Sequence, residues 1–191
     1  MKSLDTKLAI VTGAARGIGL ATAKLFKQNG YRVALVDKDK EELNNLSIND
    51  VNEKKFCFDI SDSTQLDNMY EEILNWHDRI DVLINNAGIA DFGVIEKTTI
   101  DRWNEVMKTN LDAVFLATQK AIPSLKKTKG NIINIASISG LRASTLRVAY
   151  GTSKAAVIQL TKQQAAELGE YGLFTFARFM NVEAGVDEVP V

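Results

Sequence analysis

The stretch Thr12-Gly13-Ala14-Ala15-Arg16-Gly17-Ile18-Gly19 decides how the rest of this chain is interpreted. An apolar run precedes it at residues 8–11, and a helical pattern follows it at residues 20–28. Glycines between a strand and a helix let the backbone turn tightly, and they bring N–H groups and the helix N-terminus against a pyrophosphate. The stretch therefore predicts a phosphate-binding loop. The alternative is a glycine-rich turn that binds no ligand.

Short continuous apolar runs alternate along the chain with longer helical patterns, which is typical of parallel strands covered by helices on both faces. Six runs qualify as strands: Leu8 to Val11, Arg32 to Val36, Lys55 to Phe58, Val82 to Ile84, Asn131 to Ile135, and Leu173 to Phe179. The pattern predicts a single α/β domain over residues 1–191. Its doubly wound parallel sheet is a Rossmann fold with α/β/α layers and strand order 3-2-1-4-5-6.

Composition excludes several classes of function. The 191 residues carry 23 basic and 24 acidic side chains, so the chain has no surplus of positive charge for nucleic acid or anionic lipid. No apolar run approaches the ~18 residues that a membrane span requires. One cysteine and one histidine cannot form an internal disulfide or a histidine-rich metal site. We therefore expect a cytoplasmic protein without a metal, nucleic-acid or membrane partner.

An acidic residue at the end of the second strand indicates which dinucleotide the loop binds. Asp37 lies 18 residues after Gly19, close to the ~20 expected for a ribose-binding acid. Its carboxylate can accept hydrogen bonds from ribose hydroxyls and repels an additional phosphate. NAD is therefore favoured, but Arg16 and Lys38 are cations near the same place, so NADP remains possible.

Three residues with acid–base chemistry lie where the fifth strand ends and the last long helix begins. Ser137 follows the strand, and Tyr150 and Lys154 are four residues apart, so they share one helix face. An ammonium near a phenol stabilises the phenolate, as a general acid–base needs, while a serine hydroxyl can hold a carbonyl oxygen. Taken singly, each residue also has a purely structural explanation.

Two groups of amides also stand out. Asn110 falls in an apolar helical stripe, and a buried amide costs ~1–3 kcal/mol if unpaired, so we expect it to brace backbone or to hold a water. At the end of the fourth strand, residues 85–88 (Asn-Asn-Ala-Gly) place small and amide groups where a cofactor would pass. Bonding between the strand and its loop is the structural alternative.

Several motifs in order make residues 6–172 similar to the short-chain dehydrogenase/reductase family. They are T-G-A-A-R-G-I-G, Asp37, F-D-I at 58–60, N-N-A-G, Asn110, Ser137 and Y-G-T-S-K at 150–154. The resemblance implies reversible hydride transfer between NAD(P)H and a carbonyl or secondary alcohol. It also implies a homo-oligomer, a dimer or tetramer, built through the helices near 101–122 and 150–168.

The same resemblance assigns roles. Ser137 polarises the substrate carbonyl, Tyr150 is the acid–base, and Lys154 binds the nicotinamide ribose and assists the tyrosine. Asn110 holds a proton-relay water. The implied cofactor-binding residues are Thr12, Gly13, Arg16, Gly17, Ile18, Gly19, Asp37, Asp59, Ile60, Asn86, Ala87, Gly88, Tyr150 and Lys154.

The family pattern stops after Gly172. The usual proline–glycine turn is absent, and we expect a shortened member of the family, with a divergent tail at residues 173–191, that lacks the C-terminal strand and the lid. A strand at Leu173 to Phe179 would then be an uncovered edge. The alternative function is a catalytically weak or inactive nucleotide-binding protein. Cys57 is expected to be a small buried side chain, and His77 a surface or helix-capping residue.

Overall fold

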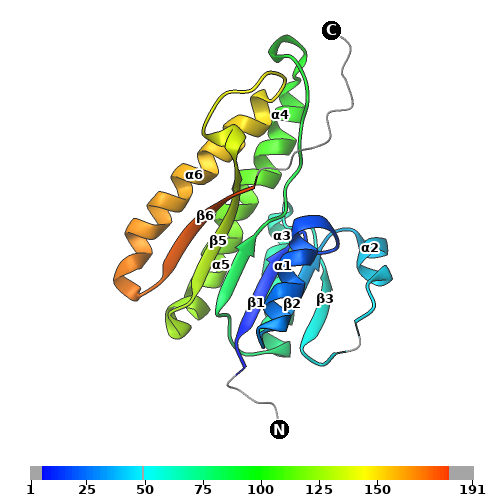
Figure 1. The fold of residues 1–191 in the computed structure, drawn as a ribbon, viewed down its shortest axis with the longest axis vertical. Helices are drawn as coiled ribbons and strands as arrows, with labels where there is room; N and C mark the ends of the chain where they lie inside the picture. The colour runs from blue at the N-terminus through cyan, green and yellow to red at the C-terminus, as the bar shows by residue number, and fades with distance from the viewer. Residues whose placement is uncertain (1–5, 49, 181–191) are drawn as a thin grey trace.

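The computed structural model describes residues 6–48 and 50–180, which form one parallel six-stranded sheet (Figure 1). The strand order is β3-β2-β1-β4-β5-β6, as the sequence predicted. The strands are β1 (Leu8–Thr12), β2 (Arg32–Asp37), β3 (Glu53–Cys57), β4 (Val82–Asn85), β5 (Asn131–Ser137) and β6 (Phe174–Met180).

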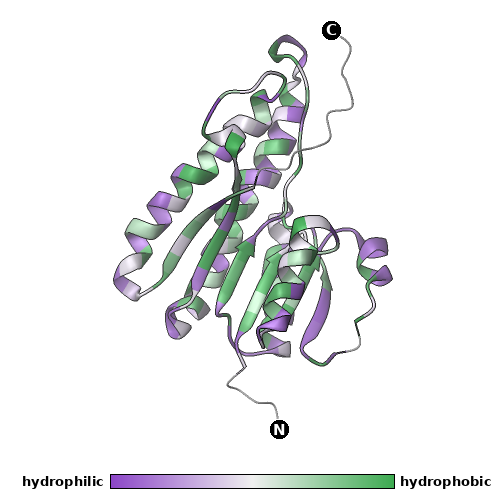
Figure 2. Cartoon of the chain, viewed as in Figure 1, coloured by the Kyte–Doolittle hydropathy of each residue, from purple (hydrophilic) through white to green (hydrophobic). Residues whose placement is uncertain are grey.

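Helices cover both faces of the sheet and divide the core into two layers. The helices are α1 (Gly17–Gln28), α2 (Lys40–Asn45), α3 (Ser63–Trp76), α4 (Ile100–Met107), α5 (Ala113–Thr128) and α6 (Val148–Leu168). On β1, Leu8 and Ile10 pack toward α3 and α5, whereas Ala9 and Val11 pack toward α1 and α2. Figure 2 shows hydrophobic residues along these central strands. This alternation is what a strand buried on both faces requires.

Five of the six strands extend one or two residues beyond the apolar runs that predicted them, whereas β3 ends one residue before its run does. Thr12, Asp37, Asn85 and Ser137 are the last residues of β1, β2, β4 and β5, because the backbone ladder continues after the side chains become polar. Since parallel strands all end at one edge, these four polar residues gather along the carboxyl edge of the sheet. In an open α/β sheet, this edge is where ligands bind.

One expectation about a single residue is wrong, and another is confirmed. Cys57 is exposed, because β3 is the outermost strand and leaves one face of its last residue uncovered. His77 caps the end of α3, as expected, but it is only 2% exposed. Its Nε2 lies 2.6 Å from the carbonyl oxygen of Thr6, which fixes the start of the chain against α3.

At the other end of the sheet, β6 carries apolar side chains that no described helix covers. Phe174 and Phe176 are 63% and 53% exposed, and their rings stack with centroids 6.3 Å apart. In the register of β5 and β6, Phe176 pairs with Ile133, so both lie on the α1 face of the sheet. Because α1 packs over β1 and β2, it does not reach this end of the sheet (Figure 1).

We predict that Phe174→Lys/Phe176→Lys reduces self-association, since an apolar strand at a sheet edge is a site of aggregation. The free energy of unfolding should change by no more than about 1 kcal/mol, because both side chains are exposed. Light scattering against protein concentration measures the effect. Val51→Lys, at a position 80% exposed near the opposite edge, is the control. Equal scattering from the wild type and both variants would refute the prediction.

Candidate active site

The loop after β1 has the conformation that its glycines predict. Gly13 and Gly17 have φ angles of +64° and +56°, in the region that favours glycine. A Cβ on Gly19 would lie 2.1 Å from the carbonyl oxygen of Gly13, so only glycine lets α1 pack this closely against the loop. No side chain caps the N-terminus of α1. The loop and the uncapped helix end together fit a pyrophosphate.

A second loop, after β4, is bonded directly to the glycine loop. The Thr12 hydroxyl accepts hydrogen bonds from the backbone N–H groups of Asn86 and Ala87, at 3.0 and 3.1 Å. The Asn86 side-chain amide donates to the carbonyl oxygens of Thr12 and Gly13, at 2.9 and 3.1 Å. Thr12 and Asn86 therefore hold the two loops in position relative to each other, at the point where strand order reverses.

A crevice of about 250 Å³ lies between these loops and the end of β2. Eight of the implied cofactor-binding residues line it: Gly13, Arg16, Asp37, Asp59, Ile60, Asn86, Ala87 and Gly88. Each carboxylate oxygen of Asp37 accepts a backbone hydrogen bond, from Ala15 at 3.0 Å and from Asp39 at 3.1 Å. The carboxylate is thus fixed at the mouth of the crevice.

The two cations that left NADP possible are both paired with acids. The Arg16 guanidinium lies 3.4 Å from a carboxylate oxygen of Asp39 and 3.8 Å from one of Glu42. The Lys38 ammonium lies 3.6 Å from a carboxylate oxygen of Asp59. Carboxylates therefore partly neutralise the positive charge that a 2′-phosphate would need.

A second cavity, of about 340 Å³, adjoins the crevice and shares Asn86, Gly88 and Ile89 with it as lining residues. Ser137, Tyr150 and Lys154 all line this cavity, so β5 and α6 bring together the three residues singled out in the sequence. Ile18, from the start of α1, lines it as well. The Ser137 hydroxyl accepts a hydrogen bond from the Ser139 N–H at 3.2 Å, and its own proton remains available to a ligand.

Lys154 is the most strongly perturbed group in this cavity. Its ammonium donates to the carbonyl oxygen of Ile135 at 2.8 Å and lies 5.9 Å from the centre of the Tyr150 ring. The residue is 5% exposed, and burial lowers the pKa of Lys154 from 10.5 to about 8. Near neutral pH the site holds a cation that lacks most of its hydration, and such a cation attracts anionic oxygens strongly.

Asn110 is fully buried in a π-helical turn (Lys108–Asp112) between α4 and α5. Its side chain accepts from the N–H of Ile89 at 2.8 Å and donates to the carbonyl oxygen of Ile89 at 3.0 Å. It also donates to the Ser153 hydroxyl at 3.0 Å, which in turn donates to the Tyr150 carbonyl oxygen. Asn110 therefore braces the backbone, which is one of the two roles expected for its amide. Short π-helical turns of this kind are frequent at functional sites.

Asn134, an amide in the middle of the apolar strand β5, was not among the predicted site residues. It accepts a hydrogen bond from Asn85 on β4 at 2.8 Å, and it donates to Thr161 and Gln164 on α6, each at 2.9 Å. All four side chains are buried. One polar residue inside a continuous apolar run was the sequence signal for a buried hydrogen-bonded amide. Its partners lie 27 to 49 residues away in the sequence, so the run itself does not identify them.

Comparisons with known proteins agree with this geometry. The protein-family model described as "short chain dehydrogenase" matches residues 7–188, which extends beyond Gly172. Meso-2,3-butanediol dehydrogenase from Serratia marcescens is 35% identical over 171 residues, which are 88% of this chain and 68% of that protein.

Two solved structures are also similar. A short-chain dehydrogenase from Streptomyces avermitilis has a TM-score of 0.86 at 27% identity and covers 91% of this chain, while the chain spans 64% of its length. A 3-ketoacyl-(acyl-carrier-protein) reductase from Brucella melitensis, complexed with NADH, has a TM-score of 0.86 at 31% identity. The match covers 92% of this chain and 75% of the reductase.

Neither a membrane span nor a metal centre is found in the part of the chain that the structure describes. No described helix is long and apolar enough to cross a bilayer. No group of three or more His, Cys, Asp or Glu side chains in the described ranges could hold a metal ion.

The pKa of Lys154 leads to a prediction about stability. Between pH 8 and pH 10.5 the unfolded chain binds more protons than the folded chain, so this lysine makes the free energy of unfolding rise with pH. The slope is at most about 1.4 kcal/mol per pH unit, and below pH 8 the contribution is constant. Lys154→Met removes it. Urea unfolding of both proteins at about pH 7 to 10 measures the difference, which should grow in favour of the wild type above pH 8.

Lys162→Met is the matched control, because Lys162 is an exposed lysine on the same helix. Its unfolding free energy should follow that of the wild type at every pH. If Lys154→Met also ran parallel to the wild type, Lys154 would have an ordinary pKa in the folded protein.

Proposed function

Because this chain belongs to the short chain dehydrogenase family, we propose that it is an oxidoreductase that interconverts a secondary alcohol and a carbonyl compound with NAD(H). The observation that carries the proposal is that Ser137, Tyr150 and Lys154 line one cavity, which adjoins the glycine-loop crevice and shares three lining residues with it. A dinucleotide across both cavities would bring its nicotinamide end to the three side chains. We treat residues 1–191 as one nucleotide-binding domain.

In the proposed mechanism, the bound cofactor supplies the hydride acceptor or donor, and the protein supplies position and charge. When an alcohol is oxidised, the Tyr150 phenolate takes the proton of the substrate hydroxyl as the C–H bond breaks and its electron pair leaves as hydride. The Ser137 hydroxyl donates a hydrogen bond to the substrate oxygen. The buried ammonium of Lys154 favours the phenolate electrostatically and binds the ribose hydroxyls. Asn110 would hold a water in a proton relay from Lys154.

We propose NAD rather than NADP as the preferred cofactor. The Asp37 carboxylate is fixed at the mouth of the crevice by two backbone donors, where it can accept hydrogen bonds from ribose hydroxyls. A 2′-phosphate there would meet this negative charge, and Arg16 and Lys38 are already paired with acids. The NADH in the Brucella melitensis reductase structure is consistent with this preference.

The alternative, a nucleotide-binding protein with weak or no turnover, makes a different prediction. It would bind NADH through the same crevice but would not oxidise it with any carbonyl compound. In either case we expect a homo-oligomer formed through α4, α5 and α6, located in the cytoplasm. We expect small-molecule substrates and no nucleic-acid or membrane partner.

The cofactor preference is tested with Asp37→Asn. The substitution removes the negative charge, and hydrogen bonds to charged groups are worth roughly 1.5–3 kcal/mol, so NADH should bind at least about tenfold more weakly. NADPH should bind more tightly than it does to the wild type. Nucleotide fluorescence titration measures both. Asp62→Asn, at the N-cap of α3 and outside both cavities, should leave both affinities unchanged. Unchanged affinities in Asp37→Asn would assign the preference to another residue.

The reaction is tested with Tyr150→Phe, assayed by NADH oxidation with a panel of ketones. Loss of the acid–base hydroxyl should lower turnover by about 10²- to 10⁴-fold, whereas NADH affinity should fall far less, because the other cofactor-binding residues remain in place. Tyr171→Phe is the control, because Tyr171 lies beneath the Lys126 ammonium, away from both cavities. NADH binding by the wild type without any oxidation would favour the alternative. Failure to bind either nucleotide would defeat both functions.

A further inference from the structure

The proposed mechanism does not use Arg147, a cation at the cavity that Ser137, Tyr150 and Lys154 line, which we call the reactive cavity. It is the N-cap residue of α6 and lies three residues before Tyr150. Its backbone is fixed by a β-bridge to Gly93 and by a 2.7 Å hydrogen bond from the Gly151 N–H to its carbonyl oxygen. Arg147 lines both the cavity that contains Tyr150 and an adjoining cavity of about 740 Å³.

Two aromatic rings hold the guanidinium of Arg147 in place. Its central carbon lies 4.5 Å from the centre of the Phe92 ring and 5.6 Å from the centre of the Tyr150 ring. Such cation–π contacts orient a guanidinium through its faces. Its N–H donors point outward in the guanidinium plane, so stacking leaves them able to form hydrogen bonds.

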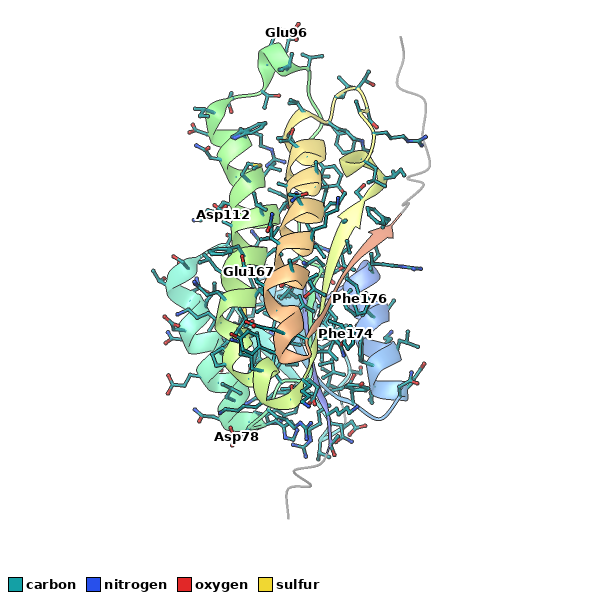
Figure 3. The ribbon with its side chains drawn as sticks, turned by 90° about the vertical axis from the view of Figure 1, so that its left-hand side faces the viewer. Asp78, Glu96, Asp112, Glu167, Phe174 and Phe176 are labelled. Atoms are coloured by element: carbon teal, nitrogen blue, oxygen red, sulfur yellow. The ribbon has the colours of Figure 1, made fainter. Side chains whose placement is uncertain are left out.

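Among the described residues, none accepts a hydrogen bond from these N–H groups. Arg16, Arg79 and Arg102 are each paired with a carboxylate, whereas Arg147 has neither an ion pair nor a side-chain hydrogen bond in the described part of the chain. Glu96 lines the adjoining cavity, but it lies at the tip of the loop before α4 (Figure 3) and makes no ion pair with Arg147.

The charged residues that line the reactive cavity also favour an anionic ligand. Arg147 and Lys154 are the charged residues that line it, and no Asp or Glu is among its described lining residues. Ser139 and Ser144 add two hydroxyl groups to the lining. A cavity with two cations, one of them buried, favours an anionic ligand.

We propose that Arg147 binds a carboxylate of the substrate, so that the natural substrate is a short hydroxy acid or its oxo acid. The guanidinium fork matches the two oxygens of a carboxylate. Since Arg147 packs against the ring of the proposed acid–base, only a few carbon atoms separate this carboxylate from the reacting carbon. This inference rests on the proposed function: the hydroxy acid loses a hydride to NAD and a proton to Tyr150, and the oxo acid and NADH are formed.

The test uses matched pairs in which a methyl group removes the negative charge. Pyruvate, acetoacetate and levulinate carry the acid group at increasing distance from the ketone, and each is compared with its methyl ester in NADH oxidation. The wild type should prefer at least one acid over its ester by tenfold or more in kcat/KM. Arg147→Met should lower kcat/KM for that acid at least tenfold more than it lowers kcat/KM for the ester, and the loss for the acid should arise mainly through KM. Arg147→Lys should restore part of the loss.

Arg142→Met is the control, because Arg142 is an exposed arginine of the loop between β5 and α6 that does not line the reactive cavity. It should keep the preference of the wild type. Thermal unfolding of each variant separates a folding defect from a change in recognition. An equal loss for acid and ester in Arg147→Met, or no preference for any acid in the wild type, would overturn the inference.

A binding experiment separates this inference from the proposed function. Calorimetry measures the affinity of the three acids and their esters for the NADH-loaded protein, with and without Arg147→Met. Tighter binding of an acid that the variant loses would support the anion site even if no turnover occurs. If NADH itself does not bind, the proposed function fails. In that case the acids are titrated into the cofactor-free protein, which tests the anion site by itself. Equal affinity of the wild type and Arg147→Met for the acids would refute the proposed anion site.

Discussion

The buried amide of Asn134 fixes the relative position of three elements on which the candidate site depends. It bonds β4, whose loop lines the crevice, to β5, which ends in Ser137, and to α6, which carries Tyr150 and Lys154. Hydrogen bonds in a low-dielectric core are strong and directional, so sliding α6 along β5 would leave several buried polar atoms unpaired. Hydrophobic contacts alone would not define this register so narrowly. In the described part of this network, only the side-chain oxygen (Oδ1) of Asn85 has no partner.

Much of the fold could be predicted from the sequence, because the glycine loop and the period of the apolar runs report local structure directly. The strand order followed from the number of strands and the rule for doubly wound sheets, and the structure confirms it. Strand ends were less accurate, since the ladder continues past the last apolar side chain. The predicted strand order already placed the third strand at the edge of the sheet, but the prediction that Cys57 is buried rested on its apolar neighbours in sequence and not on that position.

Within the candidate site, Ser137, Tyr150 and Lys154 could be predicted because their residue types and their spacing already indicate acid–base chemistry. Asn134 and Arg147 could not. The partners of Asn134 come from distant segments. The ring of Phe92, which contacts the Arg147 guanidinium, is brought next to α6 only by the fold. Thr12 and Asn86 were predicted to bind cofactor, and the structure gives both a further role in joining two loops.

That junction has a consequence for how a ligand enters. Four hydrogen bonds connect the loops after β1 and β4, and a Cβ added at Gly13 would approach the Ala87 Cα to 2.8 Å, so the two loops are already in close contact. Separating the two loops would break these hydrogen bonds, and steric contact prevents the loops from moving closer. The floor of the crevice is therefore rigid, and any opening motion must come from its walls, where exposed side chains such as Arg16 can swing aside without breaking the core.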